Sequence, residues 1–500
     1  MRKITCLLTM LVLLASLSTA SAQEDGFKAV EKKVVEFTLK NGLKFLVLPR
    51  REAPVVSFIT YADVGSADDP REQTGMAHMF EHMAFKGTPT IGTKDYKKEK
   101  TALQKVDRVY AALRTERLKV EQSDRERVEV LEEEFKKAQD EAAQYVVTDE
   151  FSTVIEQEGG VGLNAGTSYD WTSYSLSLPS NKIELWFSLE SERFLNPVLR
   201  EFYKERNVVM EERRRRTESR PIGKLIEEFL SVSFKAHPYG RPTVGHMSDL
   251  QNMTREQAEA FFQHYYVPSN LTIAVVGDVG PREIQRLAEV YFGRIPKGPK
   301  RQPIATKEPP QFGERRFTIE EQSQRIVLIG FHKGSINHED NAVFDAISDI
   351  LSAGRTSRLY RRLVRDNKIA TLAGGFGGWP GEKYPNLFLF YAFPAPGHTN
   401  EECERAIGEE IERLKTELVD EETLKKVKTR ARANLIRQLN SNDGMAAQLT
   451  AYEMLTGSWR NLFQQLDEIN AVTAEDIKRV ANQYFTTKNR TVGMIEPVSK

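Results

Sequence analysis

A helix-turn-strand segment occurs twice in this chain, and its two copies lie 219 residues apart. Each copy begins with a threonine and a nearby glutamate, reaches a pair of aromatic residues, and passes through an asparagine into a strand-like run. Threonine is favoured at the first position of a helix, and glutamate is favoured near its N-terminus. Three matches at one offset predict an internal duplication, and therefore two related domains. The matched pairs are Thr254 and Thr473, Tyr266 and Phe485, and Asn270 and Asn489.

The chain length and a proline-rich stretch agree with that division. With 500 residues, the chain is longer than a single hydrophobic core usually supports. Residues 295–312 contain five prolines and few apolar residues, so we expect an extended linker there. Amphipathic helical patterns and short strand-like runs occur on both sides of it, which favours the α+β class. The prediction is two homologous α/β domains, at residues 30–294 and 313–500.

Residues 97–147 differ in composition from the rest of the first domain. Apolar residues recur at spacings of three and four in two runs, and most residues between them are charged or carry an amide. The break between the runs falls at Ser123 and Asp124. Two such seams with a polar break predict a helical hairpin inserted into the first domain. We expect the hairpin to project into solvent and to pack mainly on itself. The alternative is a functional arm that binds a partner or forms a lid.

The N-terminal residues have the pattern of a cleavable signal peptide, which we place at residues 1–22. Arg2 and Lys3 precede an apolar run, and a small-residue cleavage pattern ends at Ala22. A periplasmic or secreted protein is therefore expected, and no later run is long enough for a membrane anchor. Basic and acidic residues both number 71, which gives no indication of nucleic-acid binding. Cys403 is the one cysteine after the signal, so an internal disulfide is not expected.

His78, Glu81 and His82 form an H-x-x-E-H motif. On a helix, His78 and His82 lie four residues apart on one face, where two imidazoles can bind one metal ion. A glutamate beside them can accept a proton from a metal-polarised water, which is the chemistry of the metalloproteases that carry this inverted motif. Such a short motif also arises by chance. The alternative is therefore a surface helix whose two histidines are hydrogen-bonded and bind no metal.

The sequence around the motif resembles the pitrilysin family of zinc metalloproteases, and in particular the bacterial proteins similar to mitochondrial processing peptidase. The resemblance covers nearly the whole mature chain. It includes residues 75–88 around the motif, together with 162–168, 266–270 and 357–360. It implies two homologous domains that close like a clamshell around an extended peptide. It also implies one Zn²⁺ ion per chain and hydrolysis of peptide bonds in unfolded substrates.

The resemblance further implies a third metal ligand, because catalytic zinc usually has three protein ligands and a water. In the family this ligand is a glutamate on a later helix, within a pair of acids seven residues apart. Glu205 and Glu212 have that spacing and share one helical face, whereas Glu211 points about 100° away. Glu212 is therefore assigned to the metal and Glu205 to a supporting catalytic position, with Glu211 as the alternative ligand.

Two further features follow from the resemblance. Asn164 and Ala165 match the family's edge strand beside the zinc, which binds substrate backbone by strand addition. Active single-chain members usually carry an arginine and a tyrosine in the second domain. This chain has Val364 and Thr371 there, although Arg365 could substitute from the next position. The chain is therefore expected to act with a related subunit that supplies the pair, as a homodimer, or slowly alone.

Two other functions stay open at this point. The chain could be a non-catalytic subunit of a pitrilysin-like heterodimer, although such subunits typically lose motif residues that this chain keeps. It could also be a peptide-binding module whose zinc is structural, in which case a fourth protein ligand would replace the water. The four arginines at 213–216 are expected to be solvated or salt-bridged, and they are given no functional role.

Overall fold

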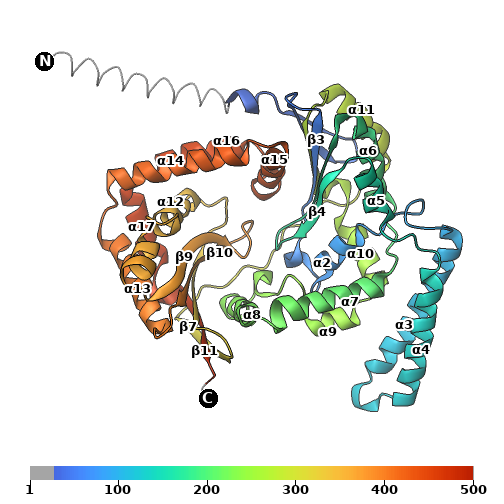
Figure 1. Cartoon of the computed structure of the whole chain (residues 1–500), viewed down its shortest axis with the longest axis horizontal. Helices are drawn as coiled ribbons and strands as arrows, with labels where there is room; N and C mark the ends of the chain where they lie inside the picture. Colours follow the sequence, from blue (N-terminus) through green and yellow to red (C-terminus); the bar gives the residue numbers. More distant parts are fainter. Residues whose placement is uncertain (1–27, 499–500) are drawn as a thin grey trace.

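The structure, a computed structural model, describes residues 28–498 as two lobes that lie side by side (Figure 1). The predicted signal peptide, residues 1–22, lies outside the described residues. Within the described part of the chain, no helix is both long enough and apolar enough to span a membrane. Each lobe is built on one β-sheet with helices on its faces, which confirms the α+β class.

The sheet of the first lobe has six strands. They are β1 (Val35–Thr38), β2 (Lys44–Pro49), β3 (Val55–Ala62), β4 (Val161–Thr167), β5 (Thr172–Pro179) and β6 (Leu271–Gly277). Their order in the sheet is β1-β2-β6-β3-β5-β4. The pair β2 and β6 is parallel, and every other neighbouring pair is antiparallel. Strand β4 therefore forms one edge of this sheet.

The sheet of the second lobe repeats this arrangement with five strands. They are β7 (Arg315–Glu321), β8 (Ile326–Lys333), β9 (Ala370–Trp379), β10 (Asn386–Pro394) and β11 (Arg490–Pro497). Their order is β7-β11-β8-β10-β9, with β7 and β11 as the parallel pair. Strand by strand this order equals β2-β6-β3-β5-β4 of the first sheet, and β9 takes the edge position of β4. The shared order and directions confirm the predicted duplication.

The repeated segments have the same structural role in both lobes. Helices α10 (Arg255–Tyr265) and α17 (Ala474–Tyr484) both begin with a capping box, in which the threonine side chain accepts from the third helical residue. Asn270 and Asn489 each donate from Nδ2 to the carbonyl of the last helical residue, at 3.0 and 2.9 Å. Each segment then enters one strand of the parallel pair, β6 or β11.

Helices on the outer face of each sheet enclose a hydrophobic core (Figure 1). In the first lobe these helices are α6 (Ile183–Leu195), α10 and α11 (Pro281–Tyr291). In the second lobe they are α12 (Asn341–Ser352), α13 (Asn400–Thr416) and α17. Helices α14 (Glu421–Gln438) and α16 (Asn461–Ala471) complete the second lobe beside α12. The two cores are therefore built by equivalent layers of helix on sheet.

The inner face of each sheet is covered by a helix from the other half of the sequence. Helix α8 (Pro221–Ser233) packs on the second sheet in one apolar cluster. Helix α15 (Asn442–Thr456) packs in the same way on the first sheet. The ring of Phe229 lies over Gly330 and Gly493, where an added Cβ atom would come within 2.9 Å of it. The two lobes are thus interlocked, because each sheet is completed by the other half.

The segment between the lobes, residues 295–312, contains no helix or strand but is held at several points. Arg301 forms an ion pair with Asp68 of the first lobe, and the N–H of Ile304 donates to a tyrosine hydroxyl of the second. Glu308 accepts from three successive backbone N–H groups just after α8. The segment is extended, as expected for a linker, and it is fixed to both lobes.

The predicted hairpin is formed by helices α3 (Tyr96–Arg117) and α4 (Arg125–Ala143), which project from the first lobe (Figure 1). Its base, however, belongs to the domain core. Glu99 is completely buried and pairs with Arg200 through both carboxylate oxygens. Tyr110 is also buried and donates to a backbone carbonyl of the main lobe. The hairpin therefore packs only partly on itself, because α3 also carries residues that belong to the core of the main lobe.

His237 lies between the lobes and links folding stability to pH. Its ring is buried against Tyr239 and against Tyr384 of the second lobe. This burial lowers the pKa of His237 to about 4. The unfolded chain therefore binds a proton at this residue at higher pH than the folded chain does. The contribution of His237 to stability is complete above its ordinary pKa of about 6.5 and is lost as the pH falls toward 4.

We predict that His237→Asn reduces the loss of stability between pH 7 and pH 5 by up to about 2 kcal/mol. Asparagine does not titrate, yet its side-chain oxygen can accept from the Tyr239 N–H that now donates to His237 Nδ1. Denaturation of the wild type and the variant at both pH values measures the difference. Equal losses of stability in the two proteins would contradict the prediction.

Candidate metal centre

Helix α2 (Met76–Met83) carries the H-x-x-E-H motif and is fixed at its N-terminus by a buried carboxylate. Asp69 accepts from the N–H groups of Gly75 and Ala77, at 2.7 and 2.9 Å. Gly75 has a φ of 89°, and a Cβ atom there would lie 2.4 Å from the carbonyl oxygen of Val244, so the turn requires glycine. The helix therefore begins at a fixed point and in a fixed direction.

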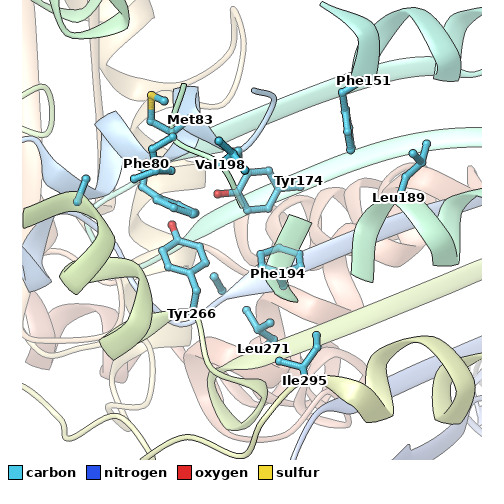
Figure 2. Close-up of a cluster of buried hydrophobic side chains, with 14 of the residues drawn as sticks. Phe80, Met83, Phe151, Tyr174, Leu189, Phe194, Val198, Tyr266, Leu271 and Ile295 are labelled. Carbon is cyan, nitrogen blue, oxygen red and sulfur yellow. The ribbon is translucent and has the colours of Figure 1, made fainter. Parts of the chain in front are cut away.

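One face of α2 is buried in the core of the first lobe. Figure 2 shows Phe80 and Met83 beside Tyr174 and Tyr266 in this core. The ring centroids of Phe80 and Tyr266 are 4.3 Å apart. With this face held by the core, the two motif histidines lie against helix α7 (Phe202–Arg213), which packs on α2.

The two motif histidines and one glutamate of α7 converge on a common point. His78 Nε2 lies 3.7 Å from Glu212 Oε1, and His82 Nε2 lies 3.5 Å from Glu212 Oε2. The ring centroids of His78 and His82 are 5.0 Å apart, with an angle of 84° between the rings. One possible ligand atom from each residue lies within 4.8 Å of the other two. Among the described residues this is the one such group of three or more.

These separations fit a shared metal ion better than direct hydrogen bonds. A hydrogen bond would bring an imidazole nitrogen and a carboxylate oxygen to about 2.7–3.0 Å. Zinc binds nitrogen and oxygen at about 2.0–2.2 Å in a tetrahedron, which separates neighbouring ligand atoms by about 3.3–3.6 Å. Two imidazoles and one carboxylate are also a ligand set of catalytic zinc. His78, His82 and Glu212 can therefore hold a zinc ion with one position left for water.

The neighbouring Glu211 points away from this group. Its side chain is 57% exposed and pairs with Arg214 at 3.0 Å, whereas the side chain of Glu212 is 11% exposed. Successive residues of a helix differ by about 100° in direction, so only one of the two glutamates can face α2. The structure brings Glu212 to the motif and leaves Glu211 in solvent.

Glu205 contacts the motif from a position seven residues earlier on α7. Its Oε2 lies 3.5 Å from His82 Nδ1, and its Oε1 accepts from Lys86 at 2.6 Å. Burial alone would raise the pKa of Glu205, but the nearby His82 ring and the hydrogen bond from Lys86 outweigh it and lower this pKa to about 2. An ionised carboxylate at Nδ1 orients the imidazole so that Nε2 faces Glu212.

The surroundings of the two histidines differ electrostatically. Burial lowers the pKa of His78 to about 4. Burial acts in the same direction on His82, but the carboxylates of Glu205 and Glu212 that face its two nitrogens outweigh it and raise the pKa of His82 to about 9. The contact with His82 contributes most to lowering the pKa of Glu212 to about 2. Because imidazole binds a metal ion in its neutral form, metal and proton compete at His82.

Glu81 lies between this group and the edge strand β4. Its side chain is half-buried, and burial raises the pKa of its carboxyl while a hydrogen bond from the Thr167 hydroxyl lowers it. Glu81 precedes His82 on α2, and the charges of His82 and Glu212 also act on its carboxyl. A carboxyl with a raised pKa in this position is suited to act as a general base.

Strand β4, which contains Asn164 and Ala165, packs beside α2. Asn164 and Ala165 face Ser175 and Tyr174 of β5 on one side. On its other side β4 has no neighbouring strand within residues 28–498. The outward N–H and C=O groups of an edge strand can pair with an extended chain. The edge next to the motif can therefore receive a peptide.

Three side chains that hold the site in place were missed by sequence analysis. Asp69 caps α2, Lys86 binds the supporting glutamate, and Arg200 fixes the loop that follows α2. The Arg200 guanidinium donates to the carbonyls of Lys86, Thr88 and Ile91. The one signal available in the sequence was the position of Asp69 shortly before the motif helix.

Two family models match this chain. Residues 46–103 and 143–246 match the model described as Insulinase (Peptidase family M16), and residues 252–431 match the model described as Peptidase M16 inactive domain. The interruption of the first match falls within α3 and α4, so most of the hairpin is an insertion relative to that model. The chain belongs to the peptidase M16 family, which confirms its resemblance to the pitrilysin-type zinc proteases.

Similar proteins and solved structures extend over nearly the whole chain. Zinc protease PqqE of Helicobacter pylori is 28% identical over 468 residues, or 92% of each chain. An uncharacterized zinc protease of Rickettsia felis is 24% identical over 90% of this chain and 94% of its own. The crystal structure of a protease from H. pylori matches 93% of this chain and 100% of its own, with a TM-score of 0.77 and 27% identity. The periplasmic protease PqqL of Escherichia coli, at 17% identity and a TM-score of 0.68, shares the fold over 93% of this chain and 47% of its own.

We predict that alanine at His78, His82 or Glu212 removes zinc from the purified protein, because each change deletes one of three converging ligands. Alanine at Glu211 should leave the zinc content unchanged, since that side chain points to solvent. Glu205→Ala should weaken zinc binding by roughly 10–100-fold through loss of the partner that orients the histidine. Metal analysis and competition with a chelator measure these effects. Zinc loss in Glu211→Ala with retention in Glu212→Ala would reverse the assignment.

Proposed function

We propose that this chain is a zinc-dependent endopeptidase that hydrolyses unfolded or extended peptides. The observation that carries the proposal is the convergence of His78, His82 and Glu212 on one point beside Glu81. The zinc protease names of similar proteins support the metal and the activity. The N-terminal pattern supports export, so N-terminal sequencing of the mature protein is expected to begin at Gln23.

Each residue around the site has its own role in the proposed reaction. His78, His82 and Glu212 hold zinc, which when bound supplies a polarised water of lowered pKa. Glu81 accepts the proton of the attacking water and delivers it to the leaving amine, for which its raised pKa is suited. Glu205 keeps the imidazole of His82 in the required orientation. The edge of β4 holds the substrate backbone as an added strand, which requires no particular side chains.

The number of protein ligands supports a catalytic metal rather than a structural one. Structural zinc sites close with four protein ligands, whereas catalytic sites keep one position for water. Within the described residues, no fourth His, Cys, Asp or Glu joins the group of His78, His82 and Glu212. The free thiol of Cys403 lies in the core of the second lobe. A peptide-binding module with structural zinc is therefore the weaker interpretation.

Glu81→Gln tests the proposal. Glutamine can hydrogen-bond to the water but cannot accept its proton, so the rate of hydrolysis of an unfolded peptide should fall by about 10²–10⁴. Zinc content should stay at the wild-type level. The matched control is Glu211→Gln, which removes a nearby carboxylate from an exposed position and should keep both zinc and activity. Activity of Glu81→Gln near wild type at full zinc occupancy would rule out Glu81 as the base.

We also propose that full activity requires a second, related subunit or a second copy of this chain. The resemblance places an arginine at Val364, which packs against the core of the second lobe. The neighbouring Arg365 pairs with Asp366, and the Thr371 hydroxyl donates to a strand carbonyl. The fold of this chain matches 47% of the length of PqqL of E. coli, so PqqL is long enough to contain two units of this size. This length supports the pairing of two such units.

The pairing proposal predicts that activity per chain depends on assembly. Peptide hydrolysis should rise with protein concentration if copies of this chain pair, or on addition of a related exported subunit from the same organism. Sedimentation at the same concentrations reports the oligomeric state. Full activity of a monomeric chain, unchanged by concentration or by the added subunit, would refute the pairing and leave the zinc site unaffected.

A further inference from the structure

The run of four arginines after α7 contains one side chain that reaches the candidate metal centre. Nη1 of Arg216 lies 2.7 Å from Oε1 of Glu212. The charge of Arg216 also acts on His78 and Glu81. The run is solvated and salt-bridged, as expected, but one of its ion pairs is made with the glutamate that faces the motif histidines.

Two other arginines of the run are engaged elsewhere. Arg213 is buried in the first lobe and pairs with Glu227 through two nitrogens, and Arg214 pairs with a solvent-exposed glutamate. Helix α7 continues into a single π-helical turn at Arg214–Glu218, and such turns are frequent at functional sites. Arg216 lies in this turn, on the side that carries the metal-facing glutamate.

Most of the Arg216 guanidinium is available to a ligand. The side chain is 66% exposed, and Glu212 is its one ion-pair partner within the described residues. A guanidinium has five N–H donors in a planar fork. One nitrogen can therefore stay on the Glu212 carboxylate while another donates to a second acceptor. The carboxylate fixes the position of the group, and the remaining donors are open to substrate.

We propose that Arg216 is a further catalytic residue, which donates an N–H to the carbonyl oxygen of the peptide bond that is cleaved. The inference rests on the proposed peptidase function. When water adds to the carbonyl, its oxygen gains negative charge, and a positioned donor stabilises that charged state more than the neutral substrate. Arg216 therefore supplies a hydrogen-bond donor from this chain. A partner subunit would supply further donors to the same oxygen.

The first test compares Arg216→Ala with Arg214→Ala, which removes the same charge from the same run at a side chain that points to Glu211. Arg216→Ala should keep wild-type zinc content and a similar KM for an unfolded fluorogenic peptide. Its kcat should fall by about 10²–10³, and Arg214→Ala should change none of these values. Arg216→Lys should recover part of kcat, because lysine keeps a charged donor.

A second measurement does not depend on turnover. A peptide phosphonamidate carries an anionic oxygen in place of the attacked carbonyl, so its affinity reports the donor directly. Calorimetry with zinc-loaded protein should show about 100-fold weaker binding to Arg216→Ala than to wild type or Arg214→Ala. Equal affinities would overturn the role, and so would a loss of zinc large enough to explain the loss of activity.

The variant Glu81→Gln separates failure of this inference from failure of the proposed function. If Glu81→Gln is fully active at full zinc occupancy, the proposed peptidase mechanism is wrong, whatever Arg216 does. If Glu81→Gln is inactive while Arg216→Ala hydrolyses peptide and binds the phosphonamidate like wild type, only the role of Arg216 is refuted.

Discussion

Helix α8 of the first half of the chain covers the second sheet, and helix α15 of the second half covers the first sheet, and these contacts join the two lobes. The central strands need apolar cover on both faces, since β6 is buried at every residue and β8 at all but one. The inner cover comes in each case from the other half of the chain. Phe229 can occupy its place because Gly330 and Gly493 leave room for the ring. The halves on either side of residues 295–312 are thus homologous, but each contributes to the core of the other.

The candidate metal centre takes its geometry from buried polar contacts around the motif. Asp69 fixes the start of α2, Arg200 fixes the loop after it, and Lys86 holds the glutamate that orients His82. Arg200 is buried and pairs with the buried Glu99, so removal of that glutamate would leave a buried charge without compensation. Such support keeps ligand atoms at the separations that a metal ion requires. Arg216 extends the same set of charges to the solvent side of the site.

Short-range patterns in the sequence were sufficient to predict much of this arrangement. Within each repeat, the capping box and the asparagine contact join residues only a few positions apart. Both copies could therefore be recognised from the sequence alone. The period of one helix distinguished Glu212 from Glu211. The spacing of apolar residues predicted the hairpin. Its attachment to the lobe could not be predicted, because Glu99 and Arg200 are far apart in the sequence and form no local pattern.

The sequence was enough to predict the helix-turn-strand repeat, the helical hairpin and the residues of the H-x-x-E-H motif. These depend on helical period, on capping and on turns, which act between residues close together in the chain. Three features could be seen only in the folded chain: α8 and α15 each cover the sheet of the other lobe, α2 packs on α7, and Arg216 contacts Glu212. The positions of these groups are set by whole helices packing on two sheets, and the contacts that fix them join residues far apart in sequence.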